Sequence, residues 1–128
     1  MPKWTDKVGP EDFRAIAEKA LPVIGRMLED TAVALCPVDT TRLRGSITFA
    51  TVKSRSQPSE KAGPGDGVDR PSDSYTLYVG TGVEYAPYVE YGTRFSAAQP
   101  YLRPAMDYGR KDAQKILERV IRRHLRGQ

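Results

Sequence analysis

The chain has 128 residues, which is enough for one domain with a modest hydrophobic core. Apolar residues make up 39% of it and charged residues 28%, a balance that fits a small soluble domain with some unstructured chain. No stretch is long and apolar enough for a membrane span, and the N-terminus lacks an apolar signal region, so we expect neither membrane insertion nor export. The lone Cys36 excludes an internal disulfide and suits a reducing cytosol.

The net charge of +4 is concentrated near the C-terminus. Residues 110–126 contain seven basic and two acidic side chains, a net of +5, so the rest of the chain carries −1. The basic character therefore belongs to one segment and not to the chain as a whole.

A long helix is predicted from Pro10 to about residue 35, after a loose lead-in at residues 1–9. Proline suits the first turn of a helix, and the two acidic residues that follow suit its positive end. We expect Pro22 to kink this helix and Pro37 to end it. Apolar residues recur at the three-and-four spacing of one helical face: Phe13, Ile16, Ala17, Ala20, Leu21, Ile24, Met27, Leu28 and Leu35.

Two strands are predicted after a turn at residues 39–41. The first, at 43–53, alternates apolar and polar positions like a half-buried strand. The second, at 74–80, places three apolar side chains on one face: Tyr75, Leu77 and Val79. Residues 54–73 between them are rich in Ser, Pro, Gly and charge, which indicates a mobile loop. The strands most simply form a long antiparallel hairpin with this loop at its tip.

Residues 81–98 form a tyrosine-rich connector, and Pro87 within it, with Pro100 and Pro104 shortly after it, excludes a long helix. The segment is too aromatic for a solvated loop, so we expect it to be ordered, irregular and packed. Pro104 suits the first turn of a last helix that runs to about Arg126. That helix has an apolar side and a basic side: Ala113, Ile116, Leu117, Val120 and Ile121, against Lys111, Lys115, Arg119, Arg122 and Arg126.

These elements predict one α+β domain over residues 1–128. Its antiparallel sheet is built on a long β-hairpin, with residues 54–73 as a flexible hairpin loop. An N-terminal and a C-terminal helix flank the sheet, because each has one apolar stripe to bury.

Short patterns that could suggest catalysis lack the context that the chemistry needs. Cys36 and Arg42 have the spacing of a phosphate-binding nucleophile loop. Cys36, however, follows the negative end of a predicted helix, and Pro37 removes a needed donor. The Gly80-Thr-Gly82 stretch lacks the third glycine of a dinucleotide-binding turn. We read Cys36 as a small buried hydrophobe.

The remaining ionisable groups do not form a recognisable site either. Asp66 and Asp69 do not have the spacing of a calcium loop, and we read them as part of a solvated tip. His124 projects onto the apolar side of the last helix, where packing explains it. Glu84 and Glu90 could be paired carboxylates but lack a water-activating context, and Glu90 is expected to accept backbone or arginine hydrogen bonds. We therefore expect no enzyme activity, cofactor or metal.

Two groups of residues are candidate contacts with a partner. The basic side of the last helix is either a solvated exterior or a face that meets DNA phosphates or an acidic protein: Lys115, Arg119, Arg122 and Arg126. No aromatic residue interleaves with these arginines, which argues against a single-strand stacking groove. The connector offers the aromatic candidates: Tyr85, Tyr88 and Tyr91.

Four motifs, spread over residues 10–126, carry a family resemblance. They are Cys36-Pro-Val-Asp-Thr-Thr-Arg-Leu-Arg-Gly-Ser-Ile47, Tyr78-Val-Gly-Thr-Gly-Val-Glu-Tyr-Ala86, Tyr88-Val-Glu-Tyr-Gly-Thr93 and Gln99-Pro-Tyr-Leu-Arg-Pro-Ala105. In order and spacing they resemble the tail-component family of tailed bacteriophages, also called the tail completion or head–tail joining family. Thr41 and Tyr101 stand where that family usually has glycine and phenylalanine.

The resemblance implies a non-enzymatic virion protein at the head–tail junction or upper tail, assembled in the cytoplasm of the host bacterium. Its implied partners are other neck and tail proteins, such as a tail terminator or a head-closure or connector ring, and no membrane. The loop at 54–73 would order against such a neighbour. Contact with phage DNA, and a ring of identical subunits formed on assembly, stay open. The alternative is a small basic DNA-binding module that uses the C-terminal helix.

Overall fold

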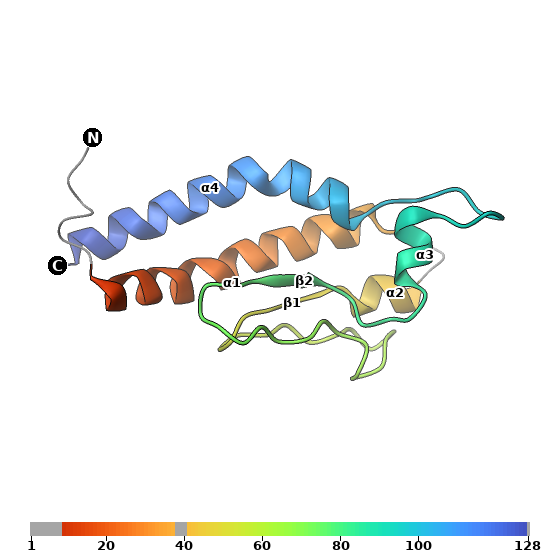
Figure 1. Cartoon of the computed structure of the whole chain (residues 1–128), viewed down its shortest axis with the longest axis horizontal. Coiled ribbons are helices and arrows are strands. Elements are labelled where there is room, and N and C mark those ends of the chain that lie inside the picture. The colour runs from red at the N-terminus through yellow and green to blue at the C-terminus, as the bar shows by residue number, and fades with distance from the viewer. Residues whose placement is uncertain (1–8, 38–40, 128) are drawn as a thin grey trace.

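The computed structural model describes residues 9–37 and 41–127, so the predicted lead-in lies outside the described residues except for Gly9. Figure 1 shows the arrangement: helix α1 (Pro10–Leu35) lies between helix α4 (Leu102–Arg126) and a small sheet. The sheet pairs β1 (Thr48–Ala50) with β2 (Tyr78–Gly80), and two short helices, α2 (Thr41–Ser46) and α3 (Ala86–Tyr91), lie beside it. The predicted α+β fold with flanking N-terminal and C-terminal helices is confirmed.

The bounds of α1 agree with the prediction. The helix begins at Pro10, where the carboxylate of Asp12 accepts a hydrogen bond from the Gly9 amide at 2.8 Å. It ends at Leu35, because Cys36 is already extended and Pro37 follows. Pro22 lies inside the helix, and the kink expected there stays a prediction. The predicted apolar stripe supplies much of the core: Ile16, Ala20, Ile24 and Leu28 are buried.

The predicted strand at 43–53 is wrong in its first half. Residues 41–46 form helix α2, and only Thr48–Ala50 is strand. Leu43 and Ile47 are four residues apart, and helical spacing lets both side chains enter one core cluster. The Ser46 hydroxyl donates to the Leu43 carbonyl at 2.6 Å within the same turn. Residues 39 and 40 of the predicted turn lie outside the described residues.

The two strands are antiparallel, as predicted, and shorter than the predicted ranges. Phe49 is opposite Val79, with Thr48 opposite Gly80 and Ala50 opposite Tyr78. All three residues of β1 are buried and not half-buried, because α1 covers one side and the following loop packs against the strand. One such contact joins the Val68 amide to the Thr48 hydroxyl at 2.8 Å.

Residues 54–73 form neither a helix nor a strand, apart from two isolated bridges. Arg55 bridges to Ala50, and Gly67 bridges to Thr81. Near the start of the loop, the Ser56 hydroxyl donates to the buried carboxylate of Glu29 on α1. The loop therefore packs along the sheet, as Figure 1 shows beneath β1 and β2. Its predicted flexibility, and its ordering against a neighbour, stay predictions.

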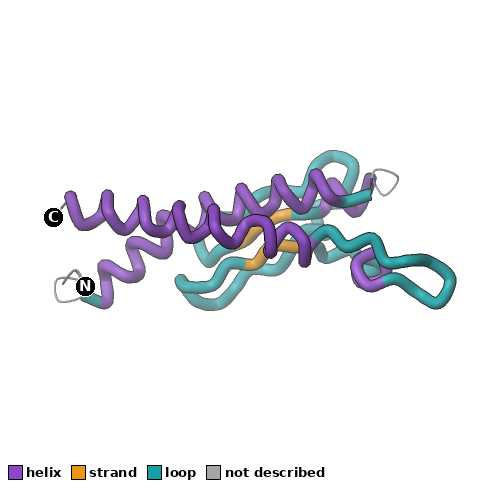
Figure 2. Tube along the Cα trace, turned by 90° about the horizontal axis from the view of Figure 1, so that it is seen from above, coloured by secondary structure: helices purple, strands orange, loops and turns teal. Residues whose placement is uncertain are grey.

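Glycine allows a close contact between α1 and the sheet. A Cβ atom on Gly25 would lie 2.7 Å from the ring of Phe49, so the ring rests directly against the helix backbone. Leu77 and Val79 of the second strand segment pack against the same side of α1, next to Ala20, Ile24 and Leu28. Figure 2, seen from above, shows α4 crossing over α1 on this side of the sheet.

Candidate interaction surface

The tyrosine-rich connector is ordered, and it builds one end of the molecule. Its first part is helix α3, only six residues long, with Pro87 in the first turn. Gly92 ends the helix with φ +80°, and residues 93–100 then project beyond α3 and α4 before α4 begins (Figures 1 and 2). The prediction that prolines prevent a long helix in this segment is confirmed.

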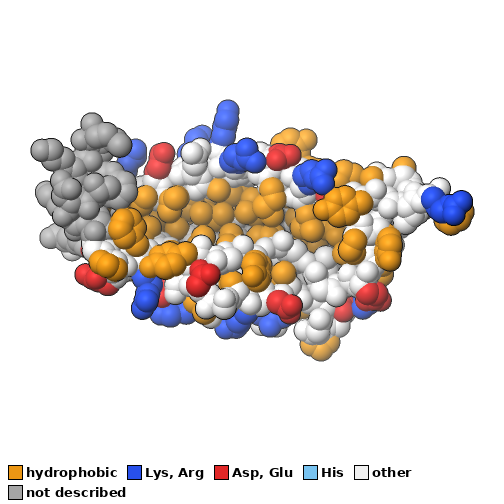
Figure 3. Space-filling view, viewed as in Figure 1, with side chains coloured by type: hydrophobic (Ala, Val, Ile, Leu, Met, Phe, Trp, Pro, Cys, Tyr) orange, Lys and Arg blue, Asp and Glu red, His pale blue; other side chains and the backbone are white. Residues whose placement is uncertain are grey.

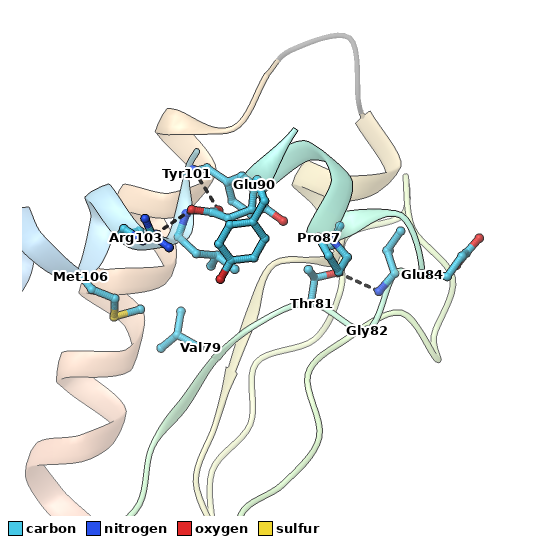
Figure 4. A pocket seen from close by; sticks show the side chains of 13 residues that line it. Val79, Thr81, Gly82, Glu84, Pro87, Glu90, Tyr101, Arg103 and Met106 are labelled. Atoms are coloured by element: carbon cyan, nitrogen blue, oxygen red, sulfur yellow. Dashed lines mark hydrogen bonds between the residues drawn. The ribbon is translucent and has the colours of Figure 1, made fainter. Parts of the chain in front are cut away.

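Glu90 fixes the start of α4. Its carboxylate accepts three backbone hydrogen bonds, from the amides of Tyr101 at 3.1 Å, Leu102 at 2.9 Å and Arg103 at 3.2 Å (Figure 4). A carboxylate at this position satisfies amides that have no partner inside the helix and faces the positive end of the helix dipole. Glu90 itself is buried. The expectation that Glu90 accepts backbone hydrogen bonds is confirmed.

The side chain of Tyr101, whose amide is one of these three donors, lies in the core. Its side chain is fully buried in the core cluster that contains Cys36, Leu43 and Ala105. The hydroxyl has no hydrogen-bond partner among the described residues. Burial raises the pKa of this phenol well above its usual value, with smaller effects of the nearby Cys36 and Glu90. Tyr101 is therefore a neutral core residue with an unsatisfied polar atom.

A cavity of about 540 Å³ lies between the end of β2, α3 and the start of α4 (Figure 4). Its walls combine apolar and polar groups: Val79, Thr81, Pro87, Glu90, Tyr101 and Met106. The Glu90 carboxylate is occupied by backbone amides, and Tyr101 is held neutral by burial.

Arg42 ties α2 to two distant segments. Its guanidinium forms a two-pronged pair with Asp66, at 2.9 Å from Nε and 3.0 Å from Nη2, and it reaches Glu84 at 3.1 Å. These contacts raise the pKa of Arg42. The bond from Arg42, helped by the Gly63 amide, lowers the pKa of Asp66 to about 2. The pKa of Glu84 is lowered by its own backbone amide and then by Arg42.

This network accounts for two patterns that had suggested chemistry. Arg42 is engaged by carboxylates and is not held open for a phosphate, and Asp66 is engaged by Arg42. Within residues 9–37 and 41–127, no three His, Cys, Asp or Glu side chains are grouped so as to hold a metal ion.

The Asp66 pair is expected to stabilise the fold less as the pH falls from about 4 to about 2. The folded pKa of about 2 lies below the ordinary value of 3.8, so the contribution is complete above 3.8 and is lost as Asp66 is protonated. The difference in Tm between the wild type and Asp66→Asn should therefore shrink over this interval. Asp69→Asn, at an exposed position of the same loop, is the control. A difference that stays constant down to pH 2 would contradict the assignment.

The candidate tyrosines lie at the α3 end but differ in exposure. Tyr85 is partly buried under the Arg42 guanidinium, 5.7 Å from its ring centre. Tyr88 and Tyr91 are 61% and 67% exposed, and Arg103 lies 5.4 Å from the centre of the Tyr91 ring. These two side chains are available to a partner in the described structure.

Two aromatic side chains of this end were missed by the sequence analysis. Phe95 is 87% exposed in the projecting loop, with the Arg94 guanidinium 5.3 Å from its ring centre. Tyr108 is 71% exposed on the first turns of α4. A lone phenylalanine within a stretch of small and polar residues between Gly92 and Pro100 was the available signal.

The basic side of α4 is exposed as predicted. None of its four candidate residues forms an ion pair with another part of the described chain: Lys115, Arg119, Arg122 and Arg126. His124 lies on the other side, where its Nε2 is 2.8 Å from the Asp12 carboxylate of α1. It joins the end of α4 to the start of α1.

A family model described as "Bacteriophage HK97-gp10, putative tail-component" matches residues 4–92, well over half of the chain. The fourth motif, at 99–105, lies beyond this range. No curated protein and no solved structure matches the chain. None of the helices within the described residues has the length and apolar character needed to cross a bilayer. The chain therefore belongs to the HK97-gp10-like family of bacteriophage tail components, and it is a structural protein of the phage particle.

Proposed function

We propose that this protein completes the tail or joins it to the head, and that it acts without catalysis by docking to neck or upper-tail proteins. The observation that carries the proposal is the exposed aromatic end built by α3 and the start of α4. Tyrosine and arginine are enriched at the centres of protein interfaces, and Tyr88, Tyr91 and Arg103 lie together here on a fixed scaffold.

The hydrogen bonds that join α3 to α4 support the same role. Glu90 holds the start of α4 against α3 through three backbone bonds, so the exposed rings are positioned before a partner arrives. Positioning before binding reduces the entropy that docking must overcome. The family membership supports a place in the virion, and the junction of head and tail is the location that we propose for it.

The double variant Tyr88→Ser/Tyr91→Ser is expected to fold normally and to fail in assembly. Both rings are mostly exposed, so the Tm should stay close to that of the wild type. Particles made with this variant as the only copy should accumulate as separate heads and tails, counted by electron microscopy. Tyr78→Ser, an exposed tyrosine on β2, is the matched control. Normal numbers of joined, infectious particles with the double variant would contradict the docking role.

The basic side of α4 supports a second candidate, a small DNA-binding module. The observation that supports this candidate is a row of exposed basic side chains that form no ion pair with the described part of the chain: Lys115, Arg119, Arg122 and Arg126. Phosphate contacts would make the affinity for DNA fall steeply with added salt, which distinguishes this role from docking through aromatic side chains. In the assembled particle, the same face would meet either DNA or an acidic protein surface.

A further inference from the structure

The outer edge of β2 is an unpaired strand edge. Within the described residues β2 has a neighbouring strand on one side only, because the sheet has the order β1–β2. Phe49 of β1 bonds on the far side of β1: its N–H donates to the Ser56 hydroxyl at 2.9 Å, and its C=O accepts from the Ser56 amide at 3.1 Å. Val79 is opposite Phe49. At such a position of an antiparallel pair both residues turn their backbone groups away from each other, so the N–H and C=O of Val79 point outward.

Two further residues extend this edge. Backbone groups alternate in direction along a strand, so those of Leu77 and Thr81 share the outward side with Val79, whereas those of Tyr78 and Gly80 face β1. The backbone N–H and C=O of Leu77 and Thr81 have no hydrogen-bond partner in the part of the chain that the structure describes. The edge therefore presents donors and acceptors at the two-residue spacing that an extended polypeptide matches.

This edge lacks the features that protect exposed strand edges in monomeric proteins, such as lysine or proline on the edge. Residues 74–83 read Ser-Tyr-Thr-Leu-Tyr-Val-Gly-Thr-Gly-Val and contain neither a charge nor a proline. On the face of the molecule where Figure 1 shows β2, Figure 3 shows apolar side chains in the middle and lysines and arginines mainly along the upper and lower borders. The cavity of about 540 Å³ borders Val79 and Thr81, so there is open space beside the strand.

A second copy of this chain can offer the same edge of β2. The far side of β1 is already occupied, because the Thr51 amide donates to the Ser54 carbonyl at 2.7 Å and Ala50 bridges to Arg55. Among the strands of the described residues, β2 is therefore the one with a free edge. An antiparallel strand is its own complement, since a residue on a twofold axis meets its counterpart and both bonds of the pair form. The neutral sequence also places no like charges opposite each other.

We propose that two copies of this chain pair through the outer edges of β2, antiparallel and about a twofold axis at Val79. Val79 exchanges both backbone hydrogen bonds with Val79 of the second copy, and Leu77 pairs with Thr81 in both directions. The two small sheets join into one sheet in the order β1–β2–β2–β1. The same surface is used on both sides, so the association closes at the dimer. This inference goes beyond the proposed function and does not rest on it.

Sedimentation velocity of the full chain tests the dimer. A contact made mainly by backbone hydrogen bonds should be seen between about 10 µM and about 1 mM. Over this range the average mass should rise from 14.2 kDa toward twice that value and no further.

Hydrogen exchange tests which residues pair. Samples are labelled at about 10 µM and at about 1 mM and read at single-residue resolution by fragmentation mass spectrometry. The amides of Leu77, Val79 and Thr81 should exchange at least about tenfold more slowly at the higher concentration, because they are bonded only in the dimer. The amides of Tyr78 and Gly80 face β1 in the monomer, so their rates should change far less and serve as the internal control.

Val79→Pro removes the central outward donor and no bond to β1. Proline is tolerated in an edge strand where its missing N–H faces solvent, and at this position its ring obstructs the incoming strand. The association constant should fall at least about tenfold. Val79→Ala is the matched control, because it shortens the same side chain and keeps the amide, and it should dimerise like the wild type. Circular dichroism shows whether both variants are folded.

Tyr78→Lys tests the same register if Val79→Pro does not fold. Tyr78 is 43% exposed, and the paired register places the two copies of residue 78 about 8 Å apart. Two lysines there should lower the association constant about threefold at low salt, and 1 M salt should restore it. Tyr78→Ser keeps the backbone edge without the charge and should associate like the wild type at both salt concentrations.

The tyrosines of α3 separate this contact from the proposed docking role. Tyr88→Ser/Tyr91→Ser should dimerise like the wild type, because both side chains lie on α3 and outside residues 77–81. Dimerisation of this variant together with failed particle assembly would show two independent surfaces.

Four results would overturn the proposal. The wild type could stay monomeric up to about 1 mM, its mass could pass that of a dimer, folded Val79→Pro could associate as Val79→Ala does, or the amides of Leu77, Val79 and Thr81 could exchange at the same rate throughout. A chain shortened to begin at Gly9 identifies a competing occupant: if it dimerises whereas the full chain does not, the first eight residues cover the edge and the proposal fails.

Discussion

Glu90→Ala is expected to lower the free energy of unfolding by about 3 kcal/mol, because three backbone amides lose one shared acceptor. These amides belong to Tyr101, Leu102 and Arg103, where α4 begins, and Tyr101 is buried. Because Glu90 and Tyr101 are buried, water replaces the carboxylate only in part. The loss also removes a negative charge from the positive end of a helix of 25 residues. Urea denaturation measures the change directly.

A matched pair of variants separates the causes of this loss. Glu90→Gln keeps an oxygen acceptor and nearly the same shape, so it should cost about 1 kcal/mol. Glu84→Ala removes an exposed glutamate near the same cavity and should change stability far less than Glu90→Ala. A loss for Glu90→Ala no greater than that for Glu84→Ala would contradict the role of Glu90 as the cap of α4.

Two substitutions at Tyr101 are expected to change the free energy of unfolding in opposite directions. Tyr101→Ala should lower the free energy of unfolding by about 4 kcal/mol, because a fully buried ring leaves a cavity. Tyr101→Phe should raise it by about 1 kcal/mol, because the hydroxyl is buried without a partner among the described residues and its removal relieves a desolvation cost. Both values can be obtained from the same denaturation series as Glu90→Ala.

The increase in the free energy of unfolding expected for Tyr101→Phe is the more stringent test of the two. A destabilising effect would show that the hydroxyl has a hydrogen bond in solution. Leu102→Met, a volume-conserving change at the next position, controls for general disturbance of the first turn of α4 and should cost less than about 1.5 kcal/mol.

The parts of the fold that could be predicted from the sequence are those with local causes. Helix α1 has Pro10 at its start, apolar residues spaced along one face and Pro37 after its end, and α4 has Pro104 in its first turn. These signals lie within each segment, so the sequence alone predicts α1 and the start of α4. The role of Glu90 was also accessible, because a carboxylate in an apolar setting needs donors. The end of helix α2 was read as strand because the alternation of Ile47, Phe49 and Thr51 with their neighbours was extended back to Leu43, which lies in the helix.

The parts that could not be predicted depend on residues far apart in the chain. The pair of Arg42 with Asp66 spans 24 positions, and its partner Glu84 is 42 positions from Arg42. An apolar groove between the first half of α1 and the second half of α4 likewise combines Phe13 and Leu117 with Tyr75 from the segment before β2, and only the packing of these three segments brings the residues together. The exposure of Phe95 follows from the turn at Gly92, and no periodic pattern of apolar residues in the sequence predicts it.

The close contact at Gly25 has a consequence for how the chain folds. A two-stranded hairpin with three paired positions is too weak to persist in water by itself. The hairpin is stabilised only when the ring of Phe49 packs against Gly25 of α1. Helix α1 in turn packs against α4, which comes from the other end of the sequence. Early, middle and late segments must therefore come together in a single concerted step. We expect slow acquisition of structure and one sharp melting transition in place of stepwise loss.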